Sequence, residues 1–204
     1  MFIATYKARW RALATMISVL AIAACSAATY SANNVGAIPD GTSSTCPAPG
    51  APLKITFAAN GLMSAALTDI RVSMTFGTAH PWGGDLTATL VSPTGISFPL
   101  FGRIGAVSVS AVGSSADLSG NYVFVDPAIT SNNIWTAATN APNPGSIMEG
   151  TYATTPVGGA GAVNPPTPTG FLAAYSTLTT AGVLNGTWTL QVIDNCANDT
   201  GAIS

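Results

Sequence analysis

The chain has 204 residues, enough for one domain of ordinary size with a sizeable core. Charged residues make up only 7% of it, and the formal net charge is −2. Without the basic N-terminal segment described next, three Lys and Arg residues face eight Asp and Glu residues, a net charge of −5. This balance argues against nucleic acid as a partner. The abundance of Thr, Ser, Ala, Gly and Val suits an extracellular β-protein.

The N-terminal residues have the layout of a secretory signal peptide, which we assign to residues 1–28. Three basic residues precede a mostly apolar run over residues 13–24, which is shorter than the ~20 residues that a bilayer core requires. The run ends in Ile-Ala-Ala-Cys, a bacterial lipobox pattern that makes Cys25 a candidate for lipidation. Small residues near Ala28 equally suit ordinary cleavage. The sequence therefore predicts a bacterial protein that is either secreted or held at the cell surface by a lipid.

Beyond the signal, residues 29–51 predict a linker and residues 52–204 a β-rich domain. Apolar residues alternate with polar ones in several stretches, which is typical of half-buried strands. A turn at residues 92–95 between two of them predicts a hairpin. The predicted strands cover residues 53–57, 70–76, 86–90, 96–100, 122–125 and 188–192.

The stretch from residue 126 to residue 170 is rich in Ala, Thr, Asn, Pro and Gly, and predicts long surface loops with one short strand near Tyr152. Trp135, in this stretch, and Trp82 are candidates for an exposed contact surface, whereas Trp188 alternates inward and predicts a core residue. We find no convincing helical period. The pattern favours an all-β fold, an antiparallel β-sandwich or jelly roll.

Two segments carry a resemblance to a known family. Residues 80–95 read HPWGGDLTATLVSPTG, and residues 185–195 read NGTWTLQVIDN, followed by Asp-Thr-Gly at 199–201. In order and separation they resemble the P domain, or P/Homo B domain, that lies beside subtilisin-like proprotein convertases. The resemblance covers about residues 50–204. Pro81 departs from the family pattern, and the family normally continues into a final strand beyond the position of Ser204.

The resemblance implies a jelly-roll, galactose-binding-like β-sandwich, here lacking its last strand. It also implies a non-catalytic accessory module that packs on a protease catalytic domain or another surface protein and is associated with serine-type endopeptidases and proteolysis. Two alternatives remain open: a chain that is part of, or classified with, a subtilisin-like serine endopeptidase, and an adhesin-like structural domain of the cell surface. A membrane would be contacted only through lipid on Cys25.

The residues offer little chemistry of their own. His80 is the only histidine, and no Gly-x-Ser-x-Gly segment supplies a nucleophile, so we expect no catalysis and a His80 hydrogen-bonded to backbone. Asp85, Asp194 and Asp199 are candidate calcium ligands, but Asp85 and Asp199 can instead accept hydrogen bonds from turn amides. Cys46 and Cys196 either form a disulfide or are two free, buried cysteines.

Overall fold

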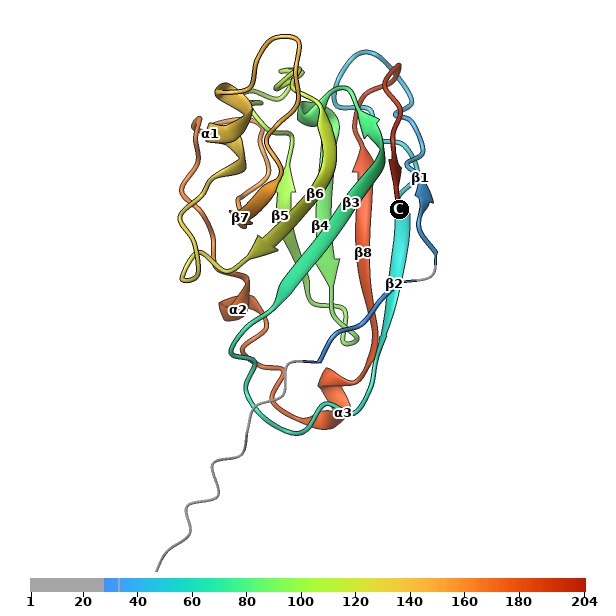
Figure 1. The fold of residues 1–204 in the computed structure, drawn as a ribbon, viewed down its shortest axis with the longest axis vertical. Helices are drawn as coiled ribbons and strands as arrows, with labels where there is room; N and C mark the ends of the chain where they lie inside the picture. The colour runs from blue at the N-terminus through green and yellow to red at the C-terminus, as the bar shows by residue number, and fades with distance from the viewer. Residues whose placement is uncertain (1–27, 33) are drawn as a thin grey trace, which may run out of the picture.

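The computed structural model describes residues 28–32 and 34–204, so the predicted lipidation site at Cys25 lies outside the described residues. The described chain is built mainly of strands, with a few short helices (Figure 1). The strands are β1 Gly36–Ala37, β2 Leu53–Ala59, β3 Arg71–His80, β4 Leu86–Val91, β5 Ser97–Gly102, β6 Leu118–Val125, β7 Gly150–Ala153, β8 Gly186–Asp194 and β9 Ala202–Ile203. The helices are the 3₁₀ turn η1 Gly83–Asp85, α1 Ile134–Thr139, α2 Phe171–Ala174 and α3 Ala181–Leu184.

The strands form two sheets. One has the order β1-β9-β3-β6-β7 and is antiparallel except for the parallel β6–β7 pair. The other, β2-β8-β4-β5, is antiparallel throughout. Side chains of both sheets meet in one core, where Phe101 of β5 stacks on Phe124 of β6 with ring centroids 5.0 Å apart. The predicted all-β fold is therefore confirmed.

The predicted strands follow from burial on alternate positions. In β3, Val72, Met74 and Phe76 are buried while the polar residues between them face outward. The hairpin predicted at residues 92–95 joins β4 to β5, and Gly95 adopts a positive φ of 87° there, which glycine tolerates best. Trp188 is buried in β8, as its alternation predicted.

Two expectations about the stretch after β6 are wrong. The chain forms α1, and Trp135 within it is 1% exposed rather than part of a contact surface. The Asn133 side chain caps this helix by accepting a hydrogen bond from the Trp135 amide at 2.9 Å. Helices of four to six residues are too short to show a helical period, and for this reason α1, α2 and α3 were not predicted. The strand predicted near Tyr152 is β7.

Both ends of the described chain join the first sheet. β9 lies between β1 and β3, and β1 comes from the stretch predicted as a linker. Asn34 in the same stretch accepts hydrogen bonds from the Thr56 amide and hydroxyl of β2 and donates one to the Lys54 carbonyl. Within the described ranges, no helix combines the length and the apolar character needed to span a membrane.

Candidate functional site

The ends of β3 and β8 bring a histidine and an aspartate together at one end of the molecule, the upper end in Figure 1. His80 ends β3 and Asp194 ends β8; their side chains are fully buried, with Nε2 of His80 3.0 Å from Oδ2 of Asp194. The other ring nitrogen, Nδ1, accepts a long hydrogen bond from the Trp82 amide at 3.4 Å, so Nε2 carries the proton and donates to Asp194. The expected backbone partner for His80 is therefore secondary, and the main one is a carboxylate.

The two sequence segments that carry the family resemblance touch each other at this end. Asp85 in η1 offers its backbone carbonyl to Asn195, which donates from its amide at 2.8 Å and from its side chain at 2.6 Å. Gly201 lies against His80, where an added Cβ would come within 2.9 Å of the histidine Cβ. A larger residue than glycine at position 201 would force these segments apart.

A disulfide closes the same region. Cys46 and Cys196 are bonded, with Cα atoms 5.2 Å apart and a sequence separation of 150 residues. Asp194 supports the second cysteine, because its Oδ1 accepts the Cys196 amide at 3.0 Å. A carboxylate oxygen of Asp85 and the two sulfur atoms all lie within 4.8 Å of one another. We call His80, Asp85, Asp194, Asp199 and this disulfide the polar corner.

Asp85 is the unusual member of the polar corner. It is 2% exposed, and its Oδ1 has no hydrogen-bond partner among the described residues, so the turn amides expected to bind this oxygen do not do so. The pKa of the Asp85 carboxyl is raised to about 7, mainly by burial and also by the negative charges of Asp194 and Asp199, while His80 and Arg103 oppose the rise. Near neutral pH this carboxyl is therefore partly protonated.

Of the three predicted calcium ligands, Asp194 has both carboxylate oxygens engaged, one by His80 and one by the Cys196 amide. Asp199 is half-buried, and burial raises its pKa. Because calcium takes six to eight oxygen ligands, this set would need further oxygen atoms from backbone or solvent. Calcium binding at these residues stays a prediction.

The buried Asp85 predicts a pH-dependent stability. Between its ordinary pKa of 3.8 and its folded value of about 7, the folded chain keeps a proton that the unfolded chain releases. The free energy of unfolding therefore falls as pH rises through this window. The total loss is on the order of 4 kcal/mol and is nearly complete above pH 7. Asp85→Asn, which mimics the neutral acid, should raise stability at pH 8 and flatten the dependence.

This dependence is measured by denaturant unfolding at pH 5 and pH 8, with the disulfide intact and a chelator present. The matched control is Asp69→Asn, since Asp69 is an exposed acid paired with Arg71 at the surface. The control should leave the wild-type pH profile unchanged. An Asp85→Asn variant that loses stability with pH as steeply as the wild type would contradict the assignment.

Next to the polar corner, residues 105–113 form an exposed apolar loop, which we call the valine loop. Its side chains Val107, Val109 and Val112 are 46%, 58% and 46% exposed. Arg103, itself 5% exposed, donates to the Val109 carbonyl at 3.0 Å and to the Ala111 carbonyl. The Trp82 indole donates to the Val112 carbonyl at 2.9 Å. The half-buried Trp82 predicted as a contact residue thus helps to hold this loop in place.

Sequence reasoning missed the roles of Arg103 and Asn195. Arg103 is an isolated cation in a Phe-Gly-Arg-Ile-Gly stretch, and its positive φ of 42° marks a tight turn. A lone arginine among apolar and glycine residues is a signal that could have been followed, since buried arginines need several acceptors. Asn195 gave no local signal, because its partner Asp85 is 110 residues away.

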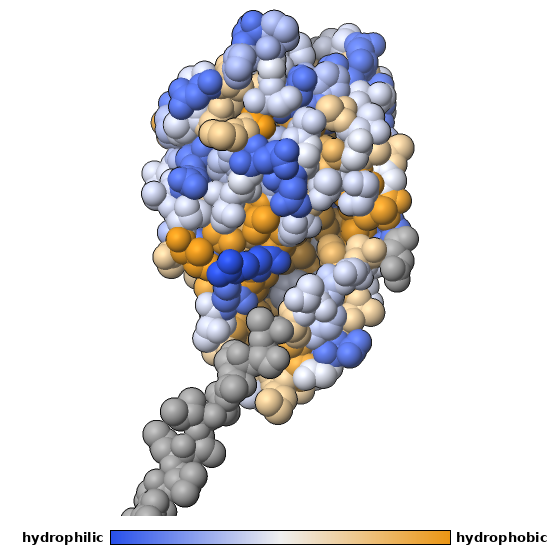
Figure 2. Space-filling view, viewed as in Figure 1, coloured by the Kyte–Doolittle hydropathy of each residue, from blue (hydrophilic) through white to orange (hydrophobic). Residues whose placement is uncertain are grey.

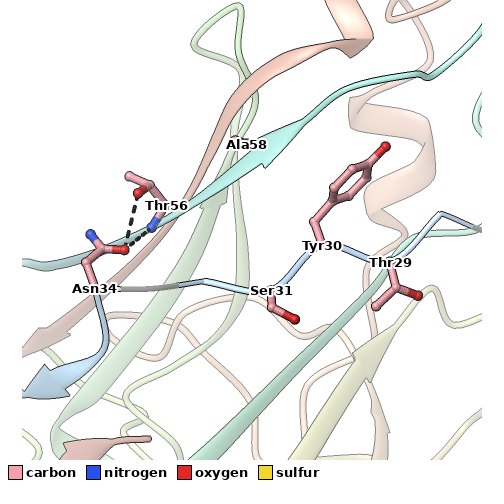
Figure 3. A pocket seen from close by; sticks show the side chains of 6 residues that line it. All are labelled: Thr29, Tyr30, Ser31, Asn34, Thr56 and Ala58. Carbon is pink, nitrogen blue, oxygen red and sulfur yellow. Dashed lines mark hydrogen bonds between the residues drawn. The ribbon is translucent and has the colours of Figure 1, made fainter.

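A surface hollow also lies away from the polar corner. It is an open groove of about 440 Å³ between the N-terminal segment, which contributes Tyr30 and Asn34, and β2, which contributes Thr56 and Ala58 (Figure 3). None of its lining residues is charged. On the face shown in Figure 2, apolar side chains gather across the middle and hydrophilic ones are scattered around them. The groove offers no set of reactive groups.

No protein-family model matches the chain, and neither a curated protein nor a solved structure matches it. The resemblance to the P domain therefore depends on the two motif segments described above.

Proposed function

We propose that this chain is a non-catalytic accessory module of the P-domain type, a jelly-roll β-sandwich that docks on a protease catalytic domain or another surface protein. The observation that carries the proposal is the valine loop, whose three exposed valines stand on a backbone fixed by Arg103 and Trp82. An apolar surface that is already ordered loses little entropy when a partner covers it.

The buried histidine supports an accessory role over a catalytic one. His80 is the only histidine in the chain, it is fully buried, and its Nε2 is committed to Asp194. A general base must reach the proton that it abstracts from a nucleophile or substrate. This pair instead links the end of β3 to the end of β8, as expected for a histidine with a structural role.

The test is co-expression with subtilisin-like catalytic domains secreted by the source organism. A catalytic domain that is the partner should gain thermal stability from the wild-type chain. Replacing Val107, Val109 and Val112 together by Ser should weaken the complex by roughly a hundredfold, at about 1 kcal/mol for each valine. Binding is measured by calorimetry or surface plasmon resonance, and stability by thermal unfolding.

The control replaces Met63 and Val163, which are 80% and 62% exposed and lie outside the valine loop, by Ser. This variant should bind as the wild type does. Equal binding by the valine-loop variant would refute the docking surface. Hydrolysis of peptide substrates by the purified chain alone, lost on His80→Ala, would refute the non-catalytic assignment.

A further inference from the structure

The disulfide and Asp85 form a compact set of donor atoms. Both sulfur atoms and one Asp85 oxygen lie within 4.8 Å of one another, and all three residues are buried. Oδ1 of Asp85 has no hydrogen-bond partner among the residues that the structure describes. A buried carboxylate oxygen without a partner is costly unless a proton or a cation satisfies it.

Breaking the disulfide would convert this set into metal ligands. Two thiolates and one carboxylate are a donor set that suits zinc, with Zn–S distances of about 2.3 Å and Zn–O distances of about 2.0 Å. In a tetrahedral zinc site with these bond lengths, the donor atoms lie roughly 3.5–4 Å from one another. The three donor atoms here already lie within 4.8 Å of one another, so only the two sulfur atoms must move apart after reduction. The cysteine Cα atoms are 5.2 Å apart, so rotation of the two side chains is sufficient to separate the sulfur atoms to this spacing without a movement of the backbone.

We propose that the reduced form of this protein binds one thiophilic divalent cation, zinc being the reference, through Cys46, Cys196 and Asp85. Solvent takes the fourth position. The oxidised form lacks this site, because sulfur atoms joined in a disulfide are not thiolate ligands. The site is thus gated by redox state, and it is independent of the docking function proposed above.

The redox step is a thiol–disulfide exchange with a dithiol reductant. The dithiol gives up two electrons and two protons, the Cys46–Cys196 bond breaks to two thiols, and the reductant leaves as its own disulfide. Binding of the cation then releases the two thiol protons. The same cation reconnects the two chain segments that the disulfide had joined.

The experiment uses the full mature chain and cobalt(II) as the probe. The protein is reduced with excess dithiothreitol, desalted under anaerobic conditions and titrated with Co²⁺. Reduced wild type should develop a thiolate-to-cobalt charge-transfer band and the visible bands of tetrahedral cobalt at one equivalent, and zinc should abolish both. The oxidised protein should show neither. Asp85→Ala should weaken binding by at least about tenfold.

Asp199→Asn is the matched control, since Asp199 contributes to the charge around Asp85 but not to the donor set. It should retain the wild-type affinity. If the reduced chain does not stay folded, addition of zinc should restore cooperative thermal unfolding in the wild type but not in Cys46→Ser. Absence of thiolate–cobalt bands and of this rescue would overturn the site. Equal affinity in Asp85→Ala would overturn the assignment of Asp85.

Discussion

Replacing Cys46 by Ser is expected to lower the free energy of unfolding by about 5 kcal/mol, the largest loss that we predict for any single substitution. The bond closes a loop of 150 residues, and the chain-entropy cost of an open loop grows with its length. The two cysteines are buried, and they join the segment before β2 to the connection between β8 and β9. Because few domains have more than 5–15 kcal/mol of stability, the variant should be close to unfolding at physiological temperature.

Denaturant unfolding of Cys46→Ser, Cys196→Ser and the double variant checks this prediction. All three lose the same cross-link, so their stabilities should agree closely, and metal-free reduced wild type should match them. A loss below about 1 kcal/mol in every case would show that the cross-link does not restrict the unfolded chain. If a single variant is much less stable than the double variant, its loss of stability comes from the remaining unpaired thiol rather than from the lost cross-link.

The strands were predictable because the two sheets bury one face of each strand. In β4, Leu86, Ala88 and Leu90 are buried and alternate with half-buried residues, so the period of two is visible in the sequence. The β4–β5 hairpin follows from Ser-Pro-Thr-Gly between two such runs. How the strands are ordered in the sheets was not predicted, since each sheet joins strands that are distant in sequence.

The short helices escaped prediction for a different reason. α1 covers six residues, and its burial comes from tertiary contacts of Ile134, Trp135 and Ala138 rather than from a repeating pattern. A stretch rich in Asn, Pro and Gly on both sides predicts loops, and only the capping Asn133 gave a local sign of a helix start.

The site was only partly predictable. The motif segments contain His80, Asp85 and Asp194, but the sequence did not predict that these segments contact each other. The pairing of Cys46 with Cys196 depends on a Cα distance that only the folded chain defines. Likewise, Asp85 Oδ1 has no hydrogen-bond partner in the described part of the chain, and this follows from the packing around η1.

Asp194→Ala should lower the free energy of unfolding by about 3–5 kcal/mol. Removing one partner of a buried pair leaves the other without compensation, and this costs far more than the pair itself contributes. Here the substitution would leave the His80 ring N–H and the Cys196 amide without an acceptor, since both donate to Asp194 at 3.0 Å. Asp194→Asn should cost less, because an amide oxygen can still accept one of these hydrogen bonds.

The matched control is Asp69→Ala. Asp69 also pairs with a basic group, Arg71, at 2.8 Å, but both side chains are exposed, and surface pairs of this kind contribute about 0–1 kcal/mol. Two pairs of similar geometry should therefore differ severalfold in their effect on unfolding by denaturant at pH 7. Equal losses of unfolding free energy in the two variants would mean that burial does not increase the cost of removing Asp194 from its pair with His80. A large loss confined to Asp194→Ala would identify this pair as a main stabilising contact between β3 in one sheet and β8 in the other.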